Sequence, residues 1–375
     1  MTEMVRPATL GARQWLLLGA GPAHVQVLQA LAAHPVAGVQ ITLVSAHASQ
    51  WLPGRVPGFV AGHYSAEECQ WPLEPLAQRS GVQWLRASVH ALDANARTVQ
   101  LDNGRTLAFD WVSINLPGVH NRELMEQSLP GAREHALFAH PLAALGALWP
   151  QVQTLAAQRP MRFTVVGAGT LGVELACALQ YRLPNVSVTL LSGDHPPGHR
   201  YAPALQQRLL KALKRRKITV LQDRALGVTA TTVQLGCGAE LASDVTVLAT
   251  QKQVPHWIVD SGLTLGSDGR MTVDDFQRST SHPRVFAVGD LCSTPPNETR
   301  GLSLTNHLIA TVAGQALVAP APKPAPWQVI SLGRRTAAAS WRGFTAQGAW
   351  GWWLKTWQER RWLNAMRASP TDPRV

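Results

Sequence analysis

Apolar residues along the chain repeat one order of elements: a strand, a tight turn, a helix and a second strand. Residues 14–18 form an apolar run that ends at Gly19-Ala20-Gly21. Apolar side chains then recur at the spacing of one helix face, at Val25, Leu28, Leu31 and Ala32. A further apolar run, Val39–Val44, completes a unit of roughly thirty residues that is typical of βαβ folding.

The same order returns about 150 residues later, which is the size of an ordinary domain. Residues 163–166 are apolar, the turn 167–172 is rich in glycine, and a helical spacing continues through Leu175 and Leu179. The run Val186–Leu191 closes this second unit. The pattern therefore predicts an α/β fold with two Rossmann-like dinucleotide-binding domains.

Other segments predict hairpins and a separate C-terminal piece. In residues 99–107 apolar and polar side chains alternate on either side of Asn103-Gly104, which is a strong hairpin signal. Residues 232–241 show a similar pattern of strands and turn. Proline, alanine and lysine dominate residues 319–326, as in a stiff linker. We expect a small α/β or helical tail after that linker.

The motif Gly167-x-Gly169-x-x-Gly172 is the firmest chemical signal in the chain. Its first glycine permits the tight turn, the second admits a pyrophosphate, and the third lets helix and strand pack closely. The amides that open the helix, near Thr170 and Leu171, bind phosphate without any side chain. A turn without a ligand is the alternative.

The first copy departs from this pattern. Gly19 and Gly21 are present, but after Pro22 and Ala23 comes His24, where a third glycine or alanine is expected. We therefore expect looser packing of this helix. Ser45 ends the following strand, where an acidic residue would hold a ribose. These residues form a candidate cofactor site, and a simple turn fits this copy equally well.

A third element supports the first copy. Residues 284–288 form a short, mostly apolar strand that ends at Gly289-Asp290. Glycine allows close backbone approach, and the aspartate can accept a hydrogen bond from a hydroxyl group. Taken alone, an ordinary turn aspartate would also fit.

In this order the three motifs resemble the pyridine nucleotide-disulfide oxidoreductase superfamily, in particular its type II NADH dehydrogenase-like branch without a redox-active cysteine pair. Residues 56–64, 247–250 and 331–361 support the resemblance. The chain is also similar to the flavoprotein module fused to selenophosphate synthase. The resemblance implies FAD on the first unit and NAD(P)H on the second.

The resemblance also assigns roles to single residues. Asp290 would hold the ribitol chain, and Ser303 and His307 would lie at the helix that faces the flavin pyrimidine ring. Glu174 matches a position near the nicotinamide and is the candidate catalytic residue. The alternative for Glu174 is a first-turn glutamate that favours the helix dipole.

The implied division of the chain is an FAD-binding domain of residues 1–145 and 275–320, an NAD(P)H-binding domain of residues 146–274, and a C-terminal segment of residues 321–375. Gln251 stands where the family has glycine. Together with His24 and Ser45, Gln251 leaves open a degenerate, non-catalytic protein that binds nucleotide for sensing or partner docking.

The residues near the second motif and the spacing of the cysteines bear on the electron donor and the electron acceptor. Residues 191–195 contain neither a clear ribose-binding acid nor an arginine for a 2′-phosphate, although His199 and Arg200 could approach one. The resemblance favours NADH. The four cysteines are far apart, which disfavours a thiol acceptor and favours a quinone or similar acceptor. Sulfide:quinone reductase chemistry is a minor alternative.

The composition of the chain indicates which kinds of binding partner it favours. Lys and Arg number 34 against 23 Asp and Glu, a net charge of +11 that favours anionic partners. The tail interleaves tryptophan with arginine and lysine, as at a membrane headgroup interface. Packing on the protein, a homodimer contact and nucleic-acid binding are the alternatives. No metal motif, secretion signal or spanning segment is evident, so we expect a cytoplasmic protein, peripheral to the inner face of the plasma membrane.

Overall fold

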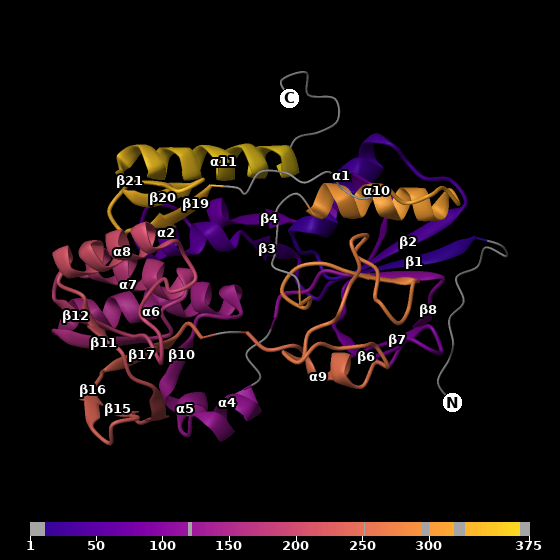
Figure 1. Cartoon of the computed structure of the whole chain (residues 1–375). Helices are drawn as coiled ribbons and strands as arrows, with labels where there is room; N and C mark the ends of the chain where they lie inside the picture. The colour runs from indigo at the N-terminus through magenta and orange to yellow at the C-terminus, as the bar shows by residue number, and fades with distance from the viewer. Residues whose placement is uncertain (1–11, 119–121, 251, 294–299, 319–326, 368–375) are drawn as a thin grey trace.

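The computed structural model describes residues 12–118, 122–250, 252–293, 300–318 and 327–367. Two five-stranded parallel sheets organise two units that lie side by side (Figure 1). The first sheet has the order β18 (Val285–Ala287), β9 (Trp111–Ile114), β1 (Arg13–Leu18), β2 (Val39–Val44) and β5 (Gln83–Leu85). The second has the order β10 (Ala136–Phe138), β17 (Val245–Leu248), β11 (Met161–Val166), β12 (Val186–Leu191) and β13 (Thr219–Leu221). The predicted α/β class with Rossmann-like sheets is confirmed.

In both units the glycine-rich turn leads from a central strand into a crossover helix. Helix α1 (Pro22–Ala33) connects β1 to β2, and helix α7 (Thr170–Arg182) connects β11 to β12. Strand β18 lies far along the chain, yet it pairs with β9 in the first sheet. The turn that carries Asp290 therefore lies at the same sheet edge as the Gly19 turn, because the carboxyl ends of parallel strands meet there.

The expected loose packing of α1 is wrong. Val25, Leu28 and Leu31 are buried against the first sheet, and α1 also lies beside α10 (Arg300–Val312). His24 is itself fully buried, so its imidazole fills space inside the unit. The histidine is accommodated because polar groups meet both ring nitrogens, as described below.

Each unit carries a small antiparallel sheet. In the first these strands are β6 (Val89–Asp93), β7 (Thr98–Leu101) and β8 (Thr106–Ala108), and in the second β14 (Ala225–Val228), β15 (Thr232–Leu235) and β16 (Glu240–Ala242). The predicted hairpin at Asn103-Gly104 is confirmed between β7 and β8, where Gly104 has φ +79°.

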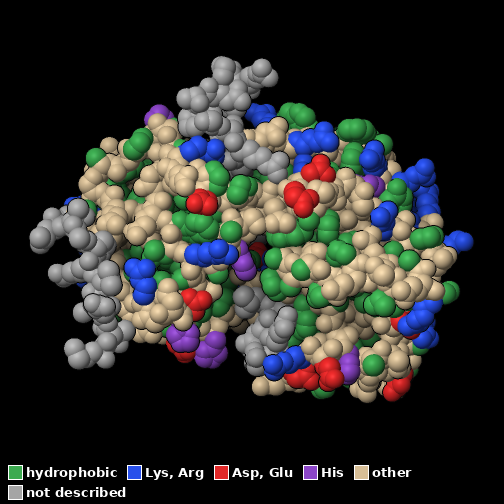
Figure 2. Space-filling model, turned by 180° about the vertical axis from the view of Figure 1, so that it is seen from behind, with side chains coloured by type: hydrophobic (Ala, Val, Ile, Leu, Met, Phe, Trp, Pro, Cys, Tyr) green, Lys and Arg blue, Asp and Glu red, His purple; other side chains and the backbone are tan. Residues whose placement is uncertain are grey.

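The remaining helices and short strands complete the two units. They are β3 (Ser49–Trp51), β4 (Gln70–Pro72), α2 (Val56–Val60), α3 (Glu74–Arg79), α4 (Arg122–Ser128), α5 (Ala132–His135), α6 (Leu142–Gln158), α8 (Pro203–Arg215) and α9 (His256–Val259), with single 3₁₀ turns at Pro53–Arg55 and Glu67–Cys69. Helix α8 follows β12 and carries basic residues. Figure 2 shows Lys and Arg side chains gathered along the edge of the molecule formed by the second unit.

The C-terminal segment folds as an antiparallel sheet with one helix over it, at the top of Figure 1. Strands β19 (Gln328–Ser331), β20 (Ala337–Trp341) and β21 (Phe344–Gly348) precede α11 (Ala349–Arg367). The segment packs on α7 and α8 of the second unit and reaches β4 of the first. The predicted linker, residues 319–326, lies outside the described residues.

Candidate functional site

The second glycine-rich turn is open toward solvent. Gly167 has φ +105°, a conformation that side chains rarely adopt, and a Cβ there would lie 2.7 Å from the Ala249 carbonyl oxygen. A Cβ on Gly172 would collide with the Gly167 carbonyl group, so this glycine is required for close packing of helix and strand. A Cβ on Gly169 would meet nothing within 4 Å. The surface in front of α7 therefore has room for a phosphate.

Side chains from later segments surround this turn. The Thr170 hydroxyl hydrogen-bonds to the Tyr201 hydroxyl. At the end of β12, Arg224 Nε donates to Asp194 Oδ1 at 2.6 Å. This bond holds the pKa of Asp194 below its usual value. The rings of His195 and His199 are 4.5 Å apart. Arg224 is a residue that sequence reasoning missed, because it lies between β13 and β14, 30 residues from Asp194 in the sequence.

Glu174 faces the C-terminal segment from the second turn of α7. Its Oε1 accepts hydrogen bonds from the Ser331 amide and from Lys355 Nζ, each at 2.7 Å. The first turn of α7 carries no acidic residue, so the alternative of a first-turn glutamate is wrong. Glu174 is 4% exposed. The carboxylate of the candidate catalytic residue is thus buried and fixed by the tail.

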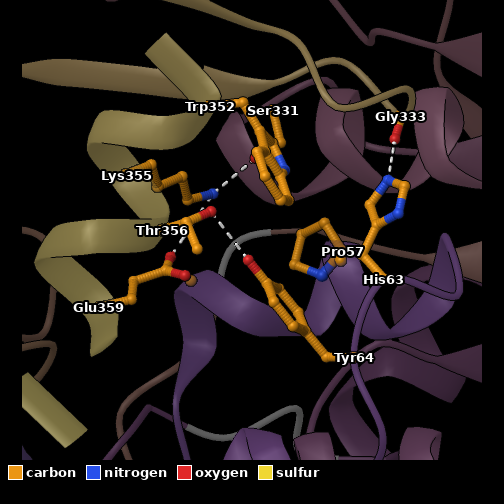
Figure 3. Close-up of a pocket in the computed structure, with 11 residues that line it drawn as sticks. Pro57, His63, Tyr64, Ser331, Gly333, Trp352, Lys355, Thr356 and Glu359 are labelled. Carbon is orange, nitrogen blue, oxygen red and sulfur yellow. Dashed lines mark hydrogen bonds and ion pairs between the residues drawn. The ribbon is translucent and has the colours of Figure 1, made fainter. Parts of the chain in front are cut away.

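Lys355 belongs to a largely buried charge cluster that comprises Arg55, Glu174, Lys355 and Glu359. Figure 3 shows Lys355 and Glu359 on α11. Lys355 Nζ lies 4.0 Å from Glu359 Oε1, and Arg55 Nε lies 3.6 Å from Glu359 Oε2. Burial opposes the charge on the ammonium, but Glu174 and Glu359 outweigh it and raise the pKa of Lys355. Burial raises the pKa of Glu359, because it disfavours the charged carboxylate.

Neutral contacts join the same elements around the charge cluster. The Tyr64 hydroxyl lies 3.0 Å from Thr356 Oγ1, and His63 Nε2 donates to the Gly333 carbonyl oxygen at 2.6 Å (Figure 3). Gly333 has φ +77°, and a Cβ there would collide with the Cys177 carbonyl oxygen of α7. The turn after β19 can approach α7 this closely because residue 333 is glycine.

The first glycine-rich turn is closed by Asn115, which follows β9. Asn115 Oδ1 accepts hydrogen bonds from the amides of Ala23 at 3.0 Å and His24 at 3.3 Å. Its Nδ2 donates to the Val288 carbonyl oxygen at 2.9 Å. A Cβ on Gly21 would collide with the Asn115 side chain. Gly21 therefore makes room for an asparagine of the protein itself.

His24 is held inside this turn. Nδ1 lies 2.6 Å from the Gly19 carbonyl oxygen, and Nε2 lies 2.8 Å from Ser113 Oγ. Burial lowers the pKa of His24 to about 4, against a smaller opposite effect of the bond to Gly19. The imidazole is neutral at pH 7 and has both nitrogens engaged with protein groups.

Asp290 is paired with Lys252, which follows β17 of the second sheet. Its Oδ2 accepts from Lys252 Nζ at 2.7 Å and from the Gly118 amide at 3.3 Å. Burial opposes the charged carboxylate, but Lys252 outweighs it and holds the pKa of Asp290 below its usual value. The carboxylate is therefore charged and able to accept a further hydroxyl group. Lys252 had no sequence signal, and Gln251 lies outside the described residues.

Two polar groups on α10 fit a bound flavin. Ser303 Oγ and His307 Nδ1 are buried and have no hydrogen-bond partner in the described part of the chain. His307 Nε2 donates to the Val318 carbonyl oxygen at 3.0 Å. Ser45 is 5% exposed and accepts from Gln50 Nε2 at 3.2 Å. The α10 side of the first unit therefore offers unused polar groups, whereas the described amides at the start of α1 are bonded to Asn115.

The cysteines, the metal-ligating side chains and the hydropathy of the helices bear on other kinds of chemistry and on membrane insertion. No disulfide joins the four cysteines, all of which are described, and burial raises the pKa of Cys69 and of Cys177 to about 12. Among the described residues no cluster of metal-ligating side chains occurs. Within the same ranges, no helix has the length and apolar character needed to cross a bilayer.

Comparison with known proteins agrees with this architecture. The sequence model of the pyridine nucleotide-disulphide oxidoreductases matches residues 13–312. An NADH dehydrogenase-like protein of Mycobacterium tuberculosis is 27% identical over 244 residues, which are 60% of this chain and 59% of the relative. The chain thus spans about three fifths of the length of that relative.

Solved structures share the fold. The sulfide:quinone oxidoreductase of Aquifex aeolicus superposes with a TM-score of 0.80 at 16% identity, over 96% of this chain and 93% of that chain. NDH2 of Plasmodium falciparum, solved in complex with NADH, gives a TM-score of 0.75 at 10% identity, over 97% and 99%. The similarity extends through the C-terminal segment.

Proposed function

The chain belongs to the pyridine nucleotide-disulphide oxidoreductases, and from this premise we propose that it is an FAD-dependent NAD(P)H dehydrogenase that passes electrons to a quinone or a similar acceptor. The observation that carries the proposal is the open helix start of α7, which lies next to the buried carboxylate of Glu174. An oxidoreductase of this family uses FAD and a pyridine nucleotide.

The chain's own groups suit this pair of cofactors in different ways. FAD, when bound, supplies the ring that accepts hydride from NAD(P)H. Asp290 would hold the ribitol chain, and Ser303 and His307 would face the flavin, as the unused polar atoms support. The amides of Thr170 and Leu171 would hold the pyrophosphate of NAD(P)H. Glu174, with Lys355 at 2.7 Å, would orient the nicotinamide carboxamide.

A quinone acceptor is supported by the state of the cysteines. A disulfide reductase needs two neighbouring thiols of which one is readily ionised. Cys69 and Cys177 are buried, and their raised pKa values disfavour the thiolate form. The similar fold of a sulfide:quinone oxidoreductase supports the quinone and keeps sulfide oxidation as a minor alternative.

We further propose that α11 rests on the inner face of the cytoplasmic membrane. Trp350, Trp353 and Trp357 are 43%, 57% and 57% exposed on one side of this helix. Arg361 lies over the Trp357 ring at 5.6 Å. Aromatic rings beside cations suit the headgroup region of an anionic membrane. The opposite side carries Trp352, which is 7% exposed and packs inward.

An absorption spectrum with an anaerobic titration tests the proposal. The purified protein should show the flavin bands and bleach on addition of NADH or NADPH, and a quinone should restore the colour. A colourless protein that takes up no FAD would overturn the proposal. Bound FAD that resists reduction would instead support a non-catalytic binding protein, the second candidate, which the Asn115 cap on the first turn favours.

A further inference from the structure

The backbone amides that open α1 are all accounted for within the protein. The amide of Gly21, which precedes the helix, donates to the Asn115 carbonyl oxygen at 3.1 Å. Pro22 has no amide hydrogen, and the amides of Ala23 and His24 donate to Asn115 Oδ1. A helix normally leaves these first donors unpaired, and they are the groups that bind a phosphate.

The start of α7 shows the opposite arrangement. Over the described ranges, no side chain caps α7, and the amides of Thr170 and Leu171 have no protein acceptor. Gly169 faces open space, whereas Gly21 faces Asn115. The amides that open α1 are therefore covered by the Asn115 side chain, whereas no described residue covers those that open α7.

Asn115 also ties together the three segments of the first unit. Besides the α1 amides, its Nδ2 donates to Val288, the residue before Gly289-Asp290. A Cβ on Gly289 would lie 3.0 Å from the same Nδ2. The side chain is 5% exposed. It thus lies where the two turns of the first sheet converge, and it cannot shift without breaking three hydrogen bonds.

We propose that Asn115 is a positioning residue that occupies the pyrophosphate-binding donors of the first unit and thereby sets how tightly this chain holds FAD. An FAD pyrophosphate reaches the Ala23 and His24 amides when the Asn115 side chain gives up its bonds to them. This inference rests on the proposed function, and it makes FAD more weakly held and more exchangeable than the fold alone implies.

The test compares the full-length protein with Asn115→Ala and Asn115→Asp by FAD titration, followed by quenching of flavin fluorescence. Asn115→Ala frees the two amides and should tighten FAD binding about tenfold, the scale of one helix cap. Asn115→Asp keeps an acceptor on the amides and adds a negative charge, so it should weaken binding about tenfold. NADH titration reports on the second unit and should be unchanged in both variants.

Each result bears on the inference. FAD affinity that is unchanged or weaker in Asn115→Ala, with NADH binding intact, overturns the role of Asn115 while the proposed function stands. If Asn115→Ala binds FAD and the natural chain does not, the result supports the inference and overturns the proposal that the natural chain is a flavoprotein. If Asn115→Ala loses NADH binding through misfolding, Asn115→Ser provides the same comparison with a smaller loss of packing. Absence of FAD binding in every form overturns both.

Discussion

Lys355 Nζ lies 2.7 Å from Glu174 Oε1, so a residue of the C-terminal helix neutralises the buried carboxylate of the second unit. The side chains of this pair are 14% and 6% exposed. Removing one partner of a buried ion pair leaves the other charge uncompensated in a medium of low polarity. The C-terminal segment is therefore part of the candidate site as well as a cover over it.

Lys355→Met should lower the free energy of unfolding by about 3–5 kcal/mol, because Glu174 and Glu359 lose their shared cation. Urea unfolding followed by circular dichroism measures this. Arg360→Met is the matched control, since Arg360 is exposed on the same helix and its loss should change stability by less than about 0.5 kcal/mol. In the double variant Lys355→Met/Glu174→Gln part of the loss should be recovered; a fully additive loss would contradict the pairing.

Acid should destabilise the protein through His24. Its pKa is about 4 in the folded chain and 6.5 as an unperturbed group, so the unfolded chain binds a proton that the folded chain does not. Stability therefore falls as the pH drops below about 6.5 and stops falling on this account below about 4. Between about pH 7.5 and about pH 4.5, His24 should account for about 2–3 kcal/mol of the loss.

Comparison with His24→Gln isolates this contribution. The variant has no group that titrates at position 24, so its unfolding free energy should fall less steeply over the same range. His90→Gln serves as the control because His90 is exposed. Equal pH dependence in the natural chain and in His24→Gln would show that the imidazole is not held neutral.

The two glycine-rich turns show how far the sequence predicts the structure. Apolar periodicity locates β1 and β2 to within a residue and identifies the buried face of α1, because each element buries one face against its neighbours. The effect of His24 was mispredicted, because its hydrogen-bond partners, the Gly19 carbonyl group and the Ser113 hydroxyl, come from the turn itself and from β9. A local motif does not indicate a partner such as Ser113, which lies 89 residues away in the sequence.

The candidate site was predictable to the same extent. Asp290 follows from a strand and a Gly-Asp pair, but Lys252 beside it comes from the segment after β17, in the other sheet. Glu174 follows from the glycine motif, yet its contacts belong to Ser331 and Lys355 in the tail. Family resemblance identifies the residues that belong to a motif. The residues that pair with them and change their charge state are brought close by long-range packing, which leaves no periodic signal in the sequence.

Asp194 and Arg224 should govern the choice of donor if NAD(P)H binds at α7. The 2.6 Å hydrogen bond between them uses the guanidinium that would otherwise face a 2′-phosphate at the end of β12. The natural chain should therefore prefer NADH. Asp194→Ala releases Arg224 and should raise the ratio of kcat/KM for NADPH to that for NADH about tenfold, a factor typical of one charged contact.

Arg224→Ala is the matching variant and should leave the ratio at or below that of the natural chain, because no cation remains for the phosphate. Steady-state oxidation of each donor with a soluble quinone measures both ratios. Raised use of NADPH in both variants would show that the pair does not face the ribose. Arg208, which bonds to Thr345 away from β12, provides a control as Arg208→Ala.

Membrane attachment should depend on the exposed tryptophans of α11. Replacement of Trp350, Trp353 and Trp357 by serine removes the apolar surface that would enter the headgroup region, and co-flotation with anionic vesicles should fall at least about tenfold. The three side chains point away from the core, so thermal stability should change little. Phe344→Ser is the control, since Phe344 is 77% exposed but precedes the helix. Equal flotation of the triple variant and the natural chain would assign these tryptophans to another surface, and flotation lost with Phe344→Ser would place the contact on β21.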